Sequence, residues 1–245
     1  AMPIKVFFHD DFYNVYTSDP AAESGRMEAV VKELEGKVEW MPIAPIAIEK
    51  VEMVHSREQI ERVKRQGVYD IAFLSAGGAC QAAELSLKET CFALIRPPGH
   101  HASSNNAWGF CYFSNMAIAV KSLIDRNLIK SAYVLDIDMH FGDGTDNILK
   151  SDDNVIVHNI ETEDRIEYMK EIEDAMSKCQ TDLIAISAGF DNHVDDWGGV
   201  LETEDYERIG HLTSVAAKRC NAGLFGILEG GYNHDVLGRN TLALL

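Results

Sequence analysis

The alternation of short apolar runs with longer helical segments constrains the fold of this chain more than any other feature. From residue 69 onward, the runs are rich in β-branched and aromatic residues. They predict strands at Tyr69–Leu74, Cys91–Ile95, Ala132–Asp138, Asn154–Val157, Asp182–Ser187 and Gly223–Leu228. The segments between them predict helices at Gly78–Lys88, Asn115–Arg126, Glu163–Lys178 and Thr203–Cys220. Strands that alternate with helices favour a parallel sheet with helices on both faces.

The first 68 residues are less regular. They predict a strand at Ile4–Phe8 and a helix at Ala22–Leu34 whose apolar side chains share one face. Two prolines make Trp40–Val54 irregular. Ser56 and the glutamine three residues later have the form of a capping box, which predicts a helix that ends at Gly67.

Length, charge and cysteine content bound the class of protein. A chain of 245 residues with 46% hydrophobic content can bury one sizeable core, so we expect residues 1–245 to form a single domain. The net charge of −17 disfavours nucleic acid and anionic membrane surfaces as partners, and it suits a cationic substrate. Five cysteines without a Cys-x-x-Cys motif are typical of reduced thiols in a cytoplasmic protein. No apolar run is long enough to span a membrane, and Ala1 has the position of a cloning scar.

Polar motifs follow four of the predicted strands. They are Arg96-Pro-Pro-Gly-His-His-Ala102, Asp136–Thr145, Ala188-Gly-Phe-Asp-Asn-His193 and Glu229-Gly-Gly-Tyr-Asn233. Ligands of open parallel sheets bind beyond the carboxyl ends of the strands. Randomly placed histidines and aspartates would rarely follow four strands that end at the same edge of a sheet. The sequence therefore predicts a metal site at this edge.

The stretch from Asp136 to Thr145 supplies most of the candidate metal ligands. Asp136, Asp138 and His140 alternate directly after an apolar run, so on a continued strand they would point the same way. An acidic strand end with one histidine is often only a solvated turn, and the other three motifs favour metal binding. Asp138, His140 and Asp191 offer oxygen and nitrogen ligands that suit Zn²⁺ and leave a coordination position for water or substrate.

The other motifs offer groups for proton transfer and charge stabilisation. His100 and His101, held by a stiff Pro-Pro-Gly turn, could accept a proton from water and deliver it to a leaving amine. Asp136 and Asp143 could each accept an imidazole N–H. Tyr232 follows two glycines and could donate to a developing oxyanion. The alternative interpretations are a pair of surface histidines and a packed turn tyrosine.

Five motifs resemble those of the zinc-dependent histone deacetylase and acetylpolyamine amidohydrolase superfamily. In chain order they are Arg96-Pro-Pro-Gly-His-His-Ala102, Gly109-Phe-Cys-Tyr-Phe113, Asp136-Ile-Asp-Met-His140, Ser187-Ala-Gly-Phe-Asp191 and Leu228-Glu-Gly-Gly-Tyr232. The resemblance implies the single-domain arginase/deacetylase-like α/β fold. It also implies an enzyme that removes acetyl groups from N-acylated amines such as acetyl-lysine or acetylpolyamines.

The resemblance implies roles for individual residues. Metal ligands, for Zn²⁺ or else Fe²⁺, would be Asp138, His140 and Asp191. Catalytic side chains would be His101 as the main general base and acid, His100 as its electrostatic neighbour, Asp136 and Asp143 as their partners, and Tyr232. Gly109 and Phe110 would form a wall of the substrate tunnel.

The chain also departs from the family pattern. Phe141 replaces the second histidine of Asp-x-Asp-x-His-His, and Trp197 stands where a proline is usual. Only 23 residues, 159–181, separate His158 from Asp182, so a glycine-rich rim segment and one aromatic tunnel wall are missing.

Two further sites are affected. The segment before Gly77 is short, and we assign no acidic residue as a clamp for the substrate backbone. Ile156 occupies the position of a hydroxyl ligand, which makes a structural monovalent cation doubtful.

Two other functions fit parts of the pattern. An arginase-like ureohydrolase would need two metals bridged by several carboxylates, whereas the histidine pair and Tyr232 favour one metal. A non-catalytic sensor of acylated amines would keep the pocket without turnover. The sequence leaves open whether the chain forms a homo-oligomer.

Overall fold

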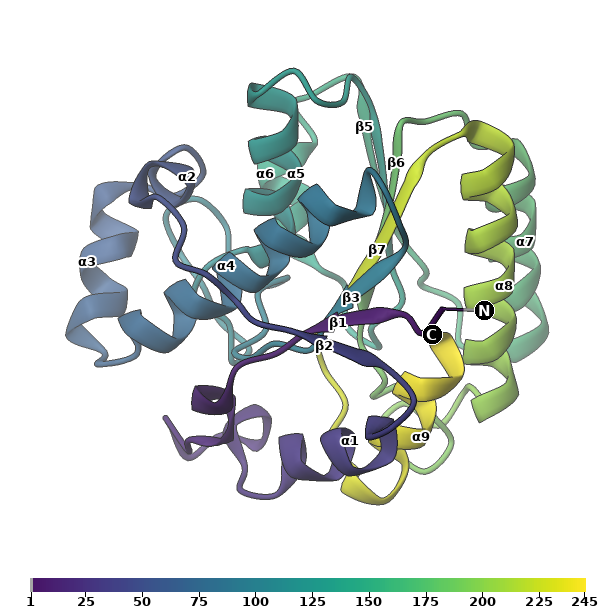
Figure 1. Cartoon of the computed structure of the whole chain (residues 1–245), viewed down its shortest axis with the longest axis horizontal. Coiled ribbons are helices and arrows are strands. Elements are labelled where there is room, and N and C mark those ends of the chain that lie inside the picture. The colour runs from purple at the N-terminus through teal and green to yellow at the C-terminus, as the bar shows by residue number, and fades with distance from the viewer. Residues whose placement is uncertain (1) are drawn as a thin grey trace.

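Seven short strands pair in parallel into one open sheet (Figure 1). The computed structural model describes residues 2–245, and Ala1, the expected cloning scar, lies outside the described residues. The strands are β1 (Lys5–Phe7), β2 (Glu39–Met41), β3 (Cys91–Ala93), β4 (Ala132–Asp136), β5 (Val155–Asn159), β6 (Leu183–Ala188) and β7 (Gly223–Leu228). Their order across the sheet is β2-β1-β3-β7-β6-β4-β5, and every neighbouring pair is parallel.

Helices cover both faces of the sheet. They are α1 (Arg26–Leu34), α2 (Ile48–Glu52), α3 (Arg57–Arg65), α4 (Tyr69–Ser86), α5 (Asn115–Asp125), α6 (Asp143–Leu149), α7 (Arg165–Lys178), α8 (Thr203–Cys220) and α9 (His234–Leu244). In Figure 1, α4, α5 and α6 lie on one side of the strands, and α7 and α8 lie on the other. α9 packs against both α8 and α1. This architecture confirms the predicted fold class.

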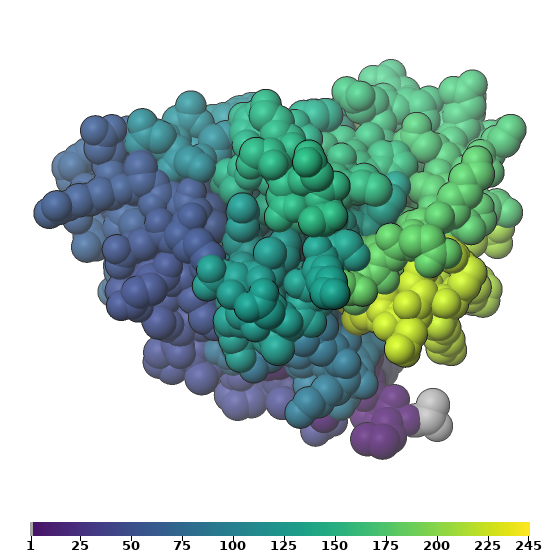
Figure 2. Space-filling view, turned by 90° about the horizontal axis from the view of Figure 1, so that it is seen from above, coloured from purple at the N-terminus to yellow at the C-terminus, as the bar shows by residue number. Residues whose placement is uncertain are grey.

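The central strands are buried along their whole length. Every residue of β3, β4, β6 and β7 is buried, as expected for parallel strands with helices on both faces. In the space-filling view, the teal middle of the chain lies between the blue part at the left and the yellow part at the right (Figure 2).

Several predicted elements are confirmed in type and position. α8 and β7 have the predicted bounds, and α3 ends just before Gly67. Ser56 caps α3 by accepting a hydrogen bond from the Gln59 N–H (3.1 Å). The Gln59 side chain does not complete a capping box, because its amide donates to the Tyr112 carbonyl (2.8 Å).

The predicted strand at Tyr69–Leu74 was wrong. These residues begin α4, which continues through the small-residue stretch to Ser86. A short apolar run cannot be distinguished by periodicity alone from a buried helical segment. Here the helical conformation lets the small side chains after Leu74 pack against β3, β7 and α5.

Four short or terminal elements were not predicted: β2, α2, α6 and α9. β2 is a three-residue edge strand, and α2 has only five residues, so neither gives a clear periodic pattern. No helix among residues 2–245 combines the length and the apolar character needed to cross a membrane. The five cysteines are free thiols, and only Cys220 is partly exposed.

Candidate metal centre and active site

The four loops that carry the motifs meet because their strands are neighbours. β3, β7, β6 and β4 lie side by side in that order and run parallel. Their carboxyl ends therefore open on the same edge of the sheet, where ligands of such sheets bind. The histidines after β3, the tyrosine after β7 and the aspartates after β4 and β6 all reach this edge.

Asp138, His140 and Asp191 converge in the way that a metal site requires. One ligand atom from each lies within 4.8 Å of the others. His140 Nδ1 lies 3.2 Å from Asp138 Oδ1 and 3.1 Å from Asp191 Oδ2. Both carboxylates are buried, and burial together with the charge of Asp138 raises the pKa of Asp191 to about 7. Two adjacent buried carboxylates beside an imidazole fit a divalent cation, which would neutralise their repulsion.

The ligands do not sit on one strand face, contrary to the alternation expected from the sequence. β4 ends at Asp136, so Asp138 and His140 belong to the loop beyond it. The loop is held by its own carboxylates: Asp136 accepts from the Asp138 N–H (3.0 Å), and Asp138 accepts from the His140 N–H (2.9 Å). Asp191 accepts from the Met139 N–H (2.9 Å), which ties the β4 and β6 loops together. Local hydrogen bonds, not strand pleating, aim the ligands.

Tyr232 reaches the same point from the β7 loop. A Cβ placed on Gly230 would lie 2.7 Å from Asp138 Oδ2, 2.9 Å from Asp191 Oδ2 and 3.0 Å from the Tyr232 hydroxyl oxygen. The tyrosine hydroxyl and the two carboxylates therefore surround one small volume that only glycine leaves open. Burial and the two nearby carboxylates raise the pKa of Tyr232 well above its usual value, so the hydroxyl keeps its proton.

His100 lies between two aspartates in the interior. Its Nδ1 is 2.8 Å from Asp136 Oδ2, and its Nε2 is 3.6 Å from Asp138 Oδ1. Burial lowers the pKa of His100, but the charges of Asp136 and Asp138 outweigh burial and hold it well above its usual value. His100 is therefore an imidazolium.

His101 has the opposite protonation. Its Nδ1 is 2.7 Å from Asp143 Oδ1, and its ring centroid is 4.2 Å from that of His100. Burial and the positive charge of His100 lower the pKa of His101 to about 4, so its ring is neutral at pH 7. With Nδ1–H donating to Asp143, Nε2 is left as the basic nitrogen.

A small cavity of about 130 Å³ lies over these groups. It is lined by Pro98, His100, His101, Trp108, Gly109, Phe110, His140, Trp197, Gly230 and Tyr232. Gly109 and Phe110, for which the family resemblance implied a wall of the substrate tunnel, line this cavity. Gly109 has a φ of +59°, and its missing side chain lets the loop pass directly over the His101 ring.

Trp197, seen in the sequence only as a departure, supplies an aromatic wall. Its indole stacks on the Tyr232 ring at 4.0 Å and 22°, and it meets His140 edge-on at 6.3 Å. Asp196 fixes this pair, since its carboxylate accepts from the backbone N–H of Trp197 (2.8 Å) and of Tyr232 (2.8 Å). The loop after β6 thus contributes an aromatic side chain to the lining of the cavity.

Two buried ionisable residues near the site, Arg26 and Glu229, had no role assigned from the sequence. Arg26 donates from Nε to the Gly231 carbonyl (2.8 Å) and from Nη2 to the Glu229 carbonyl (3.0 Å), beneath the Tyr232 ring. No motif marked it, because α1 is remote in sequence from β7. Glu229 was visible in the Leu-Glu-Gly-Gly-Tyr motif, and its Oε1 accepts from the backbone N–H of Gly99 (2.9 Å) and His100 (3.2 Å). It therefore fixes the histidine loop to β7.

Glu229 predicts a pH dependence of stability. Burial raises its pKa from 4.5 to about 7. Between these values the folded chain keeps a proton that the unfolded chain releases, so stability is lost as pH rises through this window. The loss is about 3 kcal/mol for a shift of this size. Glu229→Gln cannot titrate at this position, so its unfolding free energy should lack this loss. From pH 4.5 to 8, the unfolding free energy of wild type should therefore fall relative to that of the variant.

Urea unfolding of chelator-treated protein at several pH values measures this difference. Asp195→Asn, which changes an exposed carboxylate on a nearby loop, serves as the control. A difference between Glu229→Gln and wild type that stays constant with pH would contradict the expectation.

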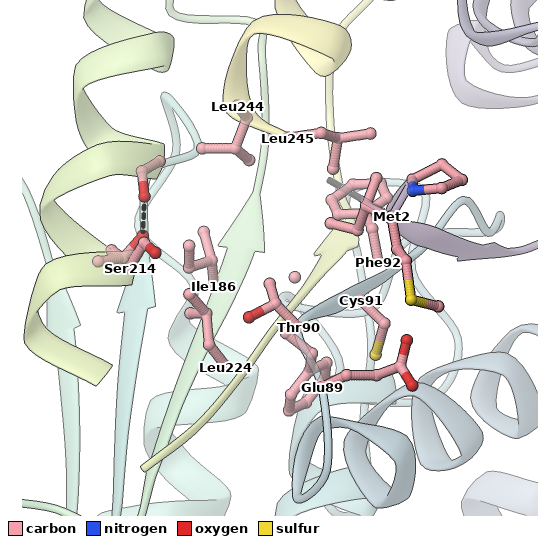
Figure 3. Close-up of a pocket in the computed structure, with 16 residues that line it drawn as sticks. Met2, Glu89, Thr90, Cys91, Phe92, Ile186, Ser214, Leu224, Leu244 and Leu245 are labelled. Carbon is pink, nitrogen blue, oxygen red and sulfur yellow. Dashed lines mark hydrogen bonds between the residues drawn. The ribbon is translucent and has the colours of Figure 1, made fainter. Parts of the chain in front are cut away.

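A larger cavity lies elsewhere. It measures about 450 Å³ and is bounded by the beginnings of β3 and β7, by α8, and by Leu244 and Leu245 (Figure 3). Among the side chains that line it, only Glu89 and Cys91 are titratable, and none is a histidine. The metal-ligand triad lies outside this cavity.

Comparison with known proteins identifies the family. A family model described as "Histone deacetylase domain" matches residues 65–168 and 158–245. A "Probable deacetylase" of Archaeoglobus fulgidus is 31% identical over 273 residues, covering 89% of this chain and 74% of that protein. A "Probable deacetylase" of Methanothermobacter thermautotrophicus is 28% identical over 300 residues, covering 98% and 89%.

A more distant relative and a solved structure extend the comparison. "Histone deacetylase HDA1" of Saccharomyces cerevisiae is 28% identical over 72% of this chain, which corresponds to 31% of that longer protein. The crystal structure of the HDA15 HD domain superposes with a TM-score of 0.84 at 22% identity, covering 100% of this chain and 88% of that one. That likeness shows the same fold. Because the family model covers most of the chain and a close relative is a deacetylase by name, the chain belongs to the histone deacetylase family.

Proposed function

We propose that the chain is a metal-dependent amidohydrolase that removes acetyl, or a similar short acyl group, from N-acylated amines. The observation that carries this proposal is the convergence of a three-ligand set, two histidine–aspartate pairs and a protonated tyrosine on one small cavity. Each polar role in amide hydrolysis then has a suitable side chain.

Asp138, His140 and Asp191 would hold one Zn²⁺ or Fe²⁺ ion, which supplies polarisation of the acyl carbonyl and acidification of water. Neutral His101 would take the proton of the attacking water on Nε2. The same imidazole would then deliver that proton to the leaving amine. The imidazolium of His100 keeps the His101 pKa low, so the two histidines have separate tasks.

Tyr232 would donate its hydroxyl proton in a hydrogen bond to the carbonyl oxygen as negative charge develops there. Tyr232→Phe should therefore keep the metal and lower kcat about 10²–10³-fold, the typical loss for one oxyanion donor. KM should change less, because the ring and its stacking on Trp197 remain. Steady-state kinetics and metal content of the same preparation measure this, and an unimpaired variant would show that the hydroxyl does not serve the reaction.

The rival ureohydrolase reaction needs a second metal with its own carboxylate ligands. Among residues 2–245, one group of three or more metal-competent side chains converges. Metal content per chain and turnover of a fluorogenic acetyl-lysine reporter test the proposal together. One ion per chain with turnover supports the amidohydrolase. Two ions with urea release would favour the ureohydrolase, and one ion without turnover of any acylated amine would favour a sensor.

Small acylated amines are the substrates that best suit the rim. The loop between β5 and α7 is short, with residues 160–164 only, so few groups remain to hold a peptide backbone. A long peptide must then order its chain at about 0.5–1.5 kcal/mol per immobilised side chain with little contact in return. Trp197 and Phe110 instead offer flat walls for a narrow aliphatic chain. The net charge of −17 favours an amine that carries positive charge.

We therefore expect kcat/KM for acetylated small amines or single-lysine reporters to equal or exceed that for acetylated histone-tail peptides. The two classes should be compared at matched ionic strength, because salt screens the general attraction of cations. A tenfold or greater preference for the peptides would contradict the substrate assignment while leaving the deacetylase reaction intact.

A further inference from the structure

Trp108 contacts both members of the His101–Asp143 pair. Its indole Nε1 donates to Asp143 Oδ2 (2.9 Å), while Asp143 Oδ1 is 2.7 Å from His101 Nδ1. Its ring also lies over His101, with centroids 4.1 Å apart and planes inclined by 33°. The indole thus bonds the carboxylate and covers the imidazole that this carboxylate orients.

The two histidine–aspartate pairs are built in the same way but from different donors. In the interior pair, Asp136 gives Oδ2 to His100, and its Oδ1 accepts from the backbone N–H of Asp138 (3.0 Å). In the outer pair, Asp143 gives Oδ1 to His101, and its Oδ2 accepts from Trp108. Each carboxylate is therefore fixed at both oxygens. For Asp143 the second donor is a side chain that a substitution can remove.

Asp143 needs this second donor more than Asp136 does. The Asp136 side chain is 2% exposed, whereas the Asp143 side chain is 36% exposed at the start of α6. The terminal torsion of an aspartate is broad, so a carboxylate at this position could rotate away from His101. A hydrogen bond to an ionised carboxylate is stronger than one between neutral groups, and that increases its hold.

The loop that carries Trp108 is well anchored. Ala102 and Ala107 form an antiparallel bridge, and Ser103 N–H donates to the Asn106 carbonyl (2.8 Å). The tip is tied to the start of α3, since the Ser56 N–H donates to the Ser104 carbonyl (2.9 Å). An indole that is 57% exposed is thereby held in a defined place.

We propose that Trp108 is a positioning residue, whose indole N–H holds the Asp143 carboxylate in the orientation that fixes the proton on His101 Nδ1 and leaves Nε2 free to accept another. The expected fall in kcat rests on the proposed function. The orientation of the Asp143 carboxylate rests on the hydrogen bond from Trp108 alone.

The experiment compares Trp108→Phe with wild type in the metal-loaded protein. Phenylalanine keeps an aromatic ring over His101 and removes the N–H. We expect full metal content, a kcat lowered about 10–100-fold, as is typical when a partner that orients a site histidine is lost, and a KM that changes little. A loss confined to KM would assign Trp108 to the substrate wall and overturn the proposal.

A double-mutant cycle with Asp143→Ala separates positioning from general packing. If Trp108 acts through Asp143, Trp108→Phe should have almost no further effect once that carboxylate is gone. Trp197→Phe is the matched control, because its indole lies at the same cavity and stacks on Tyr232 instead; its effect should add to that of Asp143→Ala. Additive effects for Trp108 as well would overturn the proposal.

A readout independent of turnover distinguishes failure of this inference from failure of the proposed function. The proton on His101 Nδ1 should give a downfield imidazole N–H resonance in ¹⁵N-histidine-labelled protein, assigned by its loss in His101→Ala. Trp108→Phe should shift or broaden this signal. An unchanged resonance would overturn the inference even in an active enzyme, and a shifted resonance would support it even if no acylated amine were hydrolysed.

Discussion

Replacing Asp191 with alanine is expected to remove bound metal and activity together. Asp191 is one of three proposed ligands that converge among residues 2–245, with Oδ2 3.1 Å from His140 Nδ1, and its carboxylate accepts from the Met139 N–H (2.9 Å). The change therefore deletes one ligand and loosens the loop that presents the other two. The loss of affinity should exceed the roughly 10–100-fold that removal of an outer-shell partner costs.

Metal content after dialysis and reporter turnover measure this expectation, and thermal unfolding adds a third observable. A metal at 1,000 times its Kd stabilises the folded protein by about 4 kcal/mol. For a chain of this size, that amounts to about 8–16 °C in Tm. A chelator should therefore lower the Tm of wild type and leave that of Asp191→Ala unchanged.

Asp195→Ala is the matched control, because its exposed carboxylate lies on the same loop and takes no part in the ligand group. It should behave as wild type in all three measurements. Full metal occupancy with normal turnover in Asp191→Ala would remove Asp191 from the ligand set.

Replacing His101 with alanine is expected to lower kcat about 10²–10⁴-fold, the range for loss of a general base and acid. His100→Ala should lower the rate less, because the His100 imidazolium keeps its proton and its Nδ1–H stays hydrogen-bonded to Asp136. It should be more damaging to stability, since it leaves Asp136 buried without its partner. Rates and Tm values for both variants separate the two roles, and equal rates for the variants and wild type would refute the assignment.

The pH profile gives a second test of His101. The base must be neutral, so activity should be present above its pKa and be lost as pH falls through it. Because burial and His100 lower the pKa of His101 to about 4, the acidic limb of kcat/KM should lie below the ordinary histidine value of about 6.5. A limb at or above 6.5 would contradict this protonation scheme.

The fold was predictable where the period of the sequence was unambiguous. α8 is a long helix with a regular apolar face, and β7 is a six-residue apolar run between turn residues, so both were located within their true bounds. The failure at α4 came from Tyr69–Leu74, a mostly apolar segment whose continuation as a helix depends on packing against β3 and β7. No local pattern contains that information.

The sequence predicted that the candidate site residues lie close together, but it did not predict how their side chains are oriented. The four motifs named His100, His101, Asp138, His140, Asp191 and Tyr232, and the structure brings all six together at one sheet edge. The alternation of Asp136, Asp138 and His140 suggested a shared strand face, yet hydrogen bonds within the loop determine their directions. Arg26 contacts Gly231 and Trp108 contacts Asp143, and both pairs are far apart in sequence. Contacts of this kind produce no local pattern in the sequence.

The place of β7 in the sheet determines when the site can form during synthesis. Among residues 2–245 it comes last of the strands in sequence, but it lies between β3 and β6, and the loop after it carries Glu229, Gly230 and Tyr232. Without β7, no strand pair joins β2-β1-β3, which leads into the histidine loop, to β6-β4-β5, which leads into the proposed metal ligands. Pairing between strands so far apart in sequence is slow. Until β7 pairs with them, the facing edges of β3 and β6 have no hydrogen-bonded neighbour. The proposed metal site therefore gains Gly230 and Tyr232 as neighbours only when β7 takes its place between β3 and β6.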